Sequence, residues 1–285
     1  MGGLSPRAVV TLACIVATAA ITGPPIMMTA EYQASKVFML AISLALYALF
    51  AVSLASFVMV MPGTIEKGNE PDVAEPDDTT ANGKLGMTCR DCDVIKVPRS
   101  HHCSQCGRCI LRMNYHCWLL GTCVGAKNLK FYTLALLYAC VGSAVSLVIT
   151  CTNADRSWTS FPGVFAFVVS VAVQFCVFVV AALYLKRHIW LVARNLTWIE
   201  YVENLQQWKK LSEKGVQHNW LHKYNHGTWA NLQSVFGDGS LLLWILPVSP
   251  SKKVHAMADQ PNPTATQRLD EMSGGFSNGH QRVEA

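Results

Sequence analysis

Seven of the eleven cysteines of this chain lie in one stretch, from Cys89 to Cys123. Paired C-x2-C spacings alternate there with histidines, which is typical of zinc sites in a reducing compartment. A disulfide framework is the alternative, but it leaves the histidine spacing unexplained. A loop-rich module of this size also has too small a hydrophobic core to fold without such ligands. The stretch therefore predicts a small zinc-stabilised module.

The number of available ligands exceeds what two zinc ions need. The candidates are Cys89, Cys92, His101, His102, Cys103, Cys106, Cys109, His116, Cys117 and Cys123. Two closed tetrahedral sites take eight ligands, and six cysteines with His102 and His116 supply them. Cys117 is the best candidate for the spare thiol, because it directly follows His116 and both could hardly bind one metal without strain. We interpret Cys117 as a functional free thiol, with a buried structural cysteine as the alternative.

Long apolar segments surround this module. Only 14% of the residues are charged and 51% are hydrophobic, whereas soluble proteins carry about 25% charged residues. Four segments are long enough to cross about 30 Å of hydrocarbon, and they cover residues 8–30, 37–61, 131–152 and 162–185. A cleaved signal peptide is the alternative for the first, but its apolar part is too long and another apolar segment follows at once. We therefore predict an all-α membrane protein with four transmembrane helices and the zinc module between the second and third.

The basic residues predict how the chain is oriented. Nine Lys and Arg lie in residues 62–130 and eleven in residues 186–285, whereas the two other links carry only Lys36 and Arg156. The positive-inside rule then places the zinc module and both termini in the cytosol. We expect an integral multi-pass protein of an endomembrane (Golgi or ER) or the plasma membrane. No dense basic patch indicates nucleic-acid binding.

The remaining chain divides by composition. We expect an acidic linker at residues 62–83 and the zinc module at 84–130. After the last span we expect a cytosolic C-terminal region at 186–249 and a disordered tail at 250–285. Apolar periodicity predicts a helix over 189–213. The apolar run from Leu241 to Pro247 is too short to span a membrane, so we expect it to dock against the membrane surface or against protein.

Together these motifs resemble the DHHC protein acyltransferase family. The spacing of C-x2-C, H-C-x2-C-x2-C and the closing C-V-G-x-x-N is matched, from Cys89 to Asn128. Residues 195–200 (N-L-T-W-I-E) resemble the T-T-x-E motif that follows the last span. Residues 224–237 resemble the C-terminal motif of Asn and aromatic residues, and Met61-Pro62-Gly63 resembles D-P-G.

The resemblance implies a ligand set, a nucleophile and partners. One Zn²⁺ would be held by Cys89, Cys92, His102 and Cys109, and the other by Cys103, Cys106, His116 and Cys123. Cys117 would take a fatty acyl chain from an acyl-CoA such as palmitoyl-CoA and pass it to a cysteine of a substrate protein. The implied partners are the lipid bilayer, acyl-CoA and proteins with cytosolic juxtamembrane cysteines.

The chain departs from the family pattern beside the nucleophile. Where the family has Asp-His-His-Cys, this chain has Asn114-Tyr115-His116-Cys117, and Trp198 replaces the second Thr of T-T-x-E. The zinc histidine is kept, but the histidine that acts as base and the aspartate that orients it are absent. His101 is a conceivable substitute base, whereas Tyr115, with an ordinary pKa of about 10, is a poor one at neutral pH.

Two functions follow from this departure. A general base contributes about 10²–10⁴-fold to a rate, so we predict a protein S-acyltransferase that is slower than its relatives. The alternative is a weak or inactive homologue that serves as a binding or regulatory partner. A zinc-based adaptor of the ubiquitin-ligase type fits poorly, because the paired ligands lack the long separation expected there.

Overall fold

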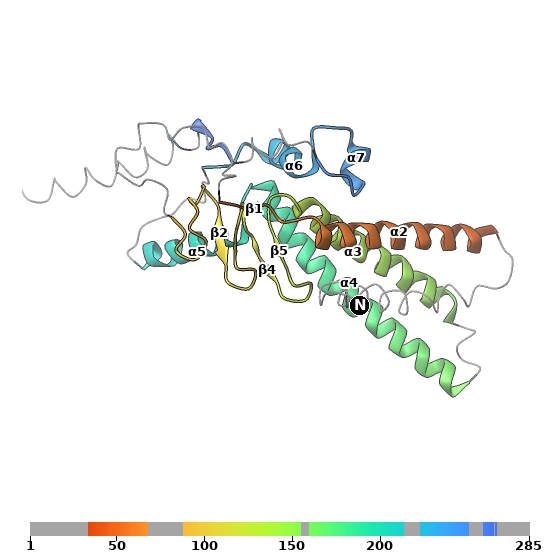
Figure 1. The fold of residues 1–285 in the computed structure, drawn as a ribbon. Coiled ribbons are helices and arrows are strands. Elements are labelled where there is room, and N and C mark those ends of the chain that lie inside the picture. Colours follow the sequence, from red (N-terminus) through yellow and green to blue (C-terminus); the bar gives the residue numbers. More distant parts are fainter. Residues whose placement is uncertain are drawn as a thin grey trace, which may run out of the picture.

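Three long helices form a bundle at one side of the molecule (Figure 1). The computed structural model describes residues 34–67, 88–154, 160–213, 223–250, 259–264 and 266. The helices are α2 (Ala34–Met59), α3 (Leu129–Thr152) and α4 (Phe161–Ala193), and α3 packs against both of the others. The predicted first span, residues 8–30, lies outside the described residues.

These three helices are long and apolar enough to cross a membrane. They cover the predicted spans 37–61, 131–152 and 162–185 almost entirely. Large apolar side chains of α4, such as Phe161, Phe165 and Leu183, are exposed, as expected where lipid replaces water. The 33 residues of α4 correspond to about 50 Å at 1.5 Å per residue, which exceeds the hydrocarbon thickness. The helix therefore continues past the membrane and reaches the cysteine-rich module.

The prediction of a single helix over 189–213 is wrong near its start, where residues 194–197 interrupt the helix. α4 ends at Ala193, and a separate helix, α5 (Trp198–Ser212), begins after a turn. Asn195 adopts a positive φ of 52° in this turn. Thr197 and Glu200 cap the start of α5 reciprocally, because the Thr197 N–H donates to Glu200 Oε2 at 2.8 Å and the Glu200 N–H donates to Thr197 Oγ1 at 3.2 Å. This capping box explains why a new helix starts here.

The cysteine-rich module contains two small antiparallel sheets, so the all-α prediction is wrong for this part of a mostly helical protein. The first has the strand order β1 (Thr64–Ile65), β3 (Arg108–Ile110), β2 (His101–Cys103), and the second pairs β4 (Tyr115–Cys117) with β5 (Thr122–Val124). In both hairpins a histidine of one strand stands opposite a cysteine of the other. The strand β1 also shows that the first residues of the predicted linker belong to the module.

The C-terminal region covers the end of the bundle that lies next to the cysteine-rich module. Its helices are α6 (Thr228–Phe236) and α7 (Leu241–Ile245), seen beside α3 in Figure 1. Lys130 Nζ, at the start of α3, donates to the carbonyls of Phe236 (3.2 Å) and Leu243 (2.8 Å). Residues 259–264 of the predicted disordered tail are among the described residues, and Asn262 Nδ2 donates to the carbonyl of Asn225 at 2.6 Å. Except for Pro250 and residue 266, the rest of that tail lies outside the described residues.

Candidate functional site

The first cluster of metal-type ligands joins a turn to the β2–β3 hairpin. It consists of Cys89, Cys92, His102 and Cys109, whose ligand atoms lie within 4.8 Å of one another. His102 and Cys109 stand opposite each other in the hairpin. The His102 Nδ1 atom lies 3.5 Å from Cys89 Sγ and 3.2 Å from Cys92 Sγ. Its other ring nitrogen, Nε2, lies 3.6 Å from a carboxylate oxygen of Asp91, the type of outer partner that fixes a ligating imidazole.

The second cluster joins the β2–β3 connection to the β4–β5 hairpin. It consists of Cys103, Cys106, His116 and Cys123, again within 4.8 Å. His116 and Cys123 are opposite residues of the hairpin. His116 Nδ1 lies 3.5 Å from Cys103 Sγ, 3.4 Å from Cys106 Sγ and 3.5 Å from Cys123 Sγ. The structure thus brings together the two sets of residues that the family resemblance implies.

Both clusters have the dimensions of tetrahedral zinc sites. Bond lengths of about 2.3 Å for Zn–S and about 2.05 Å for Zn–N place S and N ligand atoms about 3.6 Å apart, and two sulfur atoms about 3.8 Å apart. The observed S···N distances of 3.2–3.5 Å and the 3.6 Å between Cys106 Sγ and Cys123 Sγ agree with this geometry. Burial and the neighbouring cysteines raise the pKa of Cys109 to about 12, so a bound cation would favour its thiolate form. Three thiolates and one imidazole are a donor set that zinc prefers.

The strand β4 separates the metal ligand from the candidate nucleophile. Side chains alternate along a strand, so His116 lies on one face of β4 while Tyr115 and Cys117 lie on the other. The His116 face belongs to the second cluster. Tyr115 and Cys117 pack instead against the apolar core that includes Val124, Tyr132 and Val192. Cys117 is partly buried and belongs to neither metal cluster.

Tyr115 makes its polar contacts with two helices of the bundle. Its hydroxyl donates to the hydroxyl of Tyr132 on α3 at 2.8 Å and lies 2.9 Å from His188 Nε2 on α4. The three rings also contact one another, with centroids 4.7–6.2 Å apart. Burial raises the pKa of Tyr115, which keeps this hydroxyl neutral at physiological pH.

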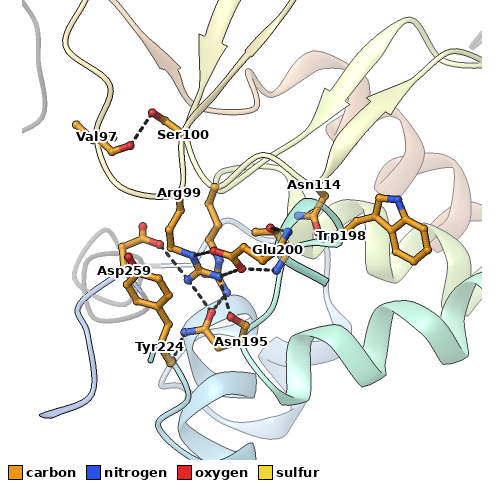
Figure 2. Close-up of polar contacts among 11 residues, drawn as sticks. Val97, Arg99, Ser100, Asn114, Asn195, Trp198, Glu200, Tyr224 and Asp259 are labelled. Carbon is orange, nitrogen blue, oxygen red and sulfur yellow. Dashed lines mark hydrogen bonds and ion pairs between the residues drawn. The ribbon is translucent and has the colours of Figure 1, made fainter. Parts of the chain in front are cut away.

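Asn114 is a structural acceptor in this chain. Its side chain is 2% exposed, and Oδ1 accepts the backbone N–H of Trp198 at 3.1 Å (Figure 2). Asn114 therefore joins the module to the first turn of α5.

A buried ionic network connects the module to the C-terminal region (Figure 2). Arg99 donates from Nε to Glu200 Oε1 at 2.7 Å and from Nη2 to Glu200 Oε2 at 2.8 Å. Asn195 Oδ1 accepts from Arg99 Nη1 at 3.0 Å and from Arg112 Nη2 at 2.5 Å. Burial and the nearby Arg99 lower the pKa of Arg112 to about 10, so its guanidinium group remains charged at neutral pH. The glutamate of the T-x-x-E motif is thus an anchor for Arg99 and a helix cap.

Sequence reasoning missed Tyr132 and His188. Tyr132 lies at the start of a mostly apolar helix, and His188 follows Lys186 and Arg187 in a run that looks like a membrane-boundary signal. His101, the conceivable substitute base, lies on β2 in the other sheet from Cys117.

Comparisons with known proteins agree on one family. Residues 84–205 match the family model described as DHHC palmitoyltransferase. "Probable protein S-acyltransferase 16" of Arabidopsis thaliana is 33% identical over 218 residues, which cover 73% of this chain and 74% of that protein. "Probable protein S-acyltransferase 15" of the same plant is 32% identical over 222 residues, or 76% of this chain and 85% of that protein. "Palmitoyltransferase ZDHHC20" of Mus musculus is 30% identical over 192 residues, or 61% of this chain and 48% of that protein.

Proposed function

This chain belongs to the DHHC palmitoyltransferase family, and we propose that it is a membrane-bound protein S-acyltransferase in which Cys117 carries the acyl group. The observation that supports this most is the position of Cys117. Its thiol lies outside both ligand sets, on the β4 face that packs against the bundle. The next residues, Trp118 and Leu119, are 85% and 51% exposed. Exposed apolar side chains at this point favour a thiol at the membrane surface, where the thioester of an acyl-CoA would lie.

The reaction consists of two transfers on Cys117. The Cys117 thiolate attacks the thioester carbonyl carbon, a new S–C bond forms, and the bond between that carbon and the CoA sulfur breaks. Coenzyme A leaves as a thiolate and takes up a proton, which balances the proton that Cys117 lost. The thiolate of a substrate protein then attacks the acyl-enzyme, and Cys117 is released as a thiolate.

The rate is expected to be low but measurable. An unperturbed cysteine is a few per cent thiolate near pH 7, and a bound acyl-CoA contributes through proximity without any base. Zinc would be structural, held by Cys89, Cys92, His102 and Cys109 in one site and by Cys103, Cys106, His116 and Cys123 in the other. Its chemistry would be limited to fixing the hairpin that carries Cys117.

We place the module, the C-terminal region and both termini in the cytosol of an endomembrane or plasma-membrane protein. The basic residues of the module support this orientation. Substrate proteins would then present juxtamembrane cysteines on the same side as Cys117.

Labelling with a clickable fatty acyl-CoA analogue tests the proposal. Wild-type protein is expected to acquire a hydroxylamine-sensitive label, Cys117→Ala to lose it, and Cys176→Ala, a matched change on the exposed face of α4, to keep it. A folded wild-type protein with no such label would overturn the enzyme proposal.

A regulatory pseudoenzyme is the second candidate, and Tyr115 is the observation that favours it. Its hydroxyl is already engaged by Tyr132 and His188, as in a site kept for structure. This function predicts that Cys117→Ala leaves the cellular role of the protein intact. Loss of that role in a folded Cys117→Ala variant would exclude it.

A further inference from the structure

Three of the departures from the family pattern, at Asn114, Tyr115 and Trp198, gather in one place. Trp198 is joined to Asn114, because its backbone N–H donates to Asn114 Oδ1 at 3.1 Å. The guanidinium carbon of Arg187 lies 4.4 Å from the centre of the Trp198 ring and 5.8 Å from that of Tyr115. Asn114, Tyr115 and Trp198 are therefore connected parts of one arrangement around the end of α4.

The centre of this arrangement is the Tyr115 hydroxyl. It contacts Tyr132 at 2.8 Å and His188 at 2.9 Å, so β4, α3 and α4 each contribute one group. We name these three side chains the hydroxyl clamp. His188 is 1% exposed and Tyr132 is 7% exposed, so water does not readily replace a lost partner. A buried polar group that loses its partner carries the full cost of desolvation, which makes the clamp rigid.

The clamp lies two residues from the nucleophile on a short strand. Tyr115 and Cys117 share one face of β4, and the strand has only three residues. The opposite face is fixed by His116 in the second cluster. Fixing the Tyr115 ring therefore restricts how far the Cys117 sulfur can move relative to the bundle.

We propose that Tyr115, held by His188 and Tyr132, is a positioning residue for Cys117. The clamp holds the thiol at the point where α3 and α4 meet the module. The residue that replaces the family's base thus acts in a different way, since it orients the nucleophile and takes no proton from it. This inference rests on the proposed function, because the reaction is that of Cys117.

Positioning of this kind has a large effect on rate. A displacement of about 1 Å at a reacting atom costs on the order of 10²-fold. Removing one hydroxyl while the ring stays in place is milder, so we expect about a tenfold fall in acyl-enzyme formation for Tyr115→Phe. His188→Gln is expected to cause a similar loss, because its amide does not reach the hydroxyl with the same geometry.

The test compares four proteins with the wild type. They are Tyr115→Phe, His188→Gln, the double variant, and Tyr184→Phe as a control that removes an exposed tyrosine hydroxyl of α4. Each is checked for retention of its zinc, and acyl-enzyme formation is then measured against acyl-CoA concentration. The maximal rate is expected to fall in the first two while half-saturation stays unchanged. Because both substitutions remove the same contact, between the Tyr115 hydroxyl and His188, the rate of the double variant is expected to remain within about twofold of that of the slower single variant.

A second measurement tests the clamp without relying on acyl transfer. Alkylation of Cys117 by iodoacetamide, followed by peptide mass spectrometry, is expected to be faster in Tyr115→Phe and His188→Gln, because a loosened strand exposes the partly buried thiol. A thiol that reacts faster with a small reagent yet more slowly with acyl-CoA has lost its position. Unchanged alkylation, or losses that multiply in the double variant, would overturn the clamp. A wild type without acyl-enzyme would overturn the proposed function, and with it the clamp's catalytic role, whatever the alkylation rates.

Discussion

Replacing Glu200 by Ala is expected to destabilise the protein strongly. The Arg99 and Glu200 side chains are only 1% and 12% exposed, and two hydrogen bonds of 2.7 and 2.8 Å join them. Removing one member of a buried ion pair costs about 3–5 kcal/mol. Asp259 Oδ1, 3.4 Å from Arg99 Nη1, would compensate the remaining charge only in part, because it is more distant and more exposed. Glu200 also accepts the Thr197 N–H at the start of α5, so the same change removes a helix cap.

Thermal unfolding in detergent, followed by tryptophan fluorescence, measures this loss. At about 2–4 °C per kcal/mol for a chain of this size, Glu200→Ala is expected to lower the Tm by roughly 6–20 °C. Glu203→Ala is the matched control, because Glu203 is an exposed residue of the same helix, and it is expected to change stability by less than about 0.5 kcal/mol. Equal Tm values for the two variants would refute the role of the buried network.

Two further predictions concern packing and metal. Gly125→Ala would place a Cβ 2.5 Å from the Pro62 carbonyl oxygen and 2.8 Å from Ile110 Cγ2, so we expect it to lower the free energy of unfolding by about 1–3 kcal/mol. Gly142→Ala is the control, because nothing lies within 4 Å of its Cβ, and it should be neutral or slightly stabilising. A neutral Gly125→Ala in the same thermal assay would contradict the close approach. Elemental analysis should find about two zinc ions per chain in the wild type. Cys109→Ser should lose at least one of them, whereas the control Cys140→Ala should lose none. Full zinc content in Cys109→Ser would exclude Cys109 as a ligand.

Local patterns predicted three of the spans and the residues that could form the metal clusters. Hydropathy marks a membrane helix without any knowledge of its neighbours, so α2, α3 and α4 were expected close to where they lie. The spacing of cysteines and histidines restricted the ligands to a few residues. The family resemblance then divided them into the two sets that the structure brings together.

Long-range contacts were not predictable in the same way. Arg99 pairs with Glu200, about a hundred residues along the chain, and nothing near either residue indicates the other. His188 and Tyr132 reach Tyr115 because α4 continues past its apolar part and α3 starts directly after the module. The short strands were missed because two or three residues carry no periodic signal. The break between α4 and α5 was missed because the apolar pattern continues across the turn at Asn195 and the capping box of Thr197 and Glu200.

The most direct test of Cys117 as the carrier of the acyl group locates that group and follows its transfer. Wild-type protein is loaded with a fatty acyl-CoA, digested, and mapped by mass spectrometry, and a second sample receives a peptide with a membrane-proximal cysteine. We expect a hydroxylamine-sensitive acyl group on the peptide that contains Cys117, and we expect it to disappear as the substrate peptide becomes acylated. Acylation of the substrate at the same rate by Cys117→Ala, or no acyl group on Cys117 in a protein that retains two zinc ions, would contradict this role of Cys117.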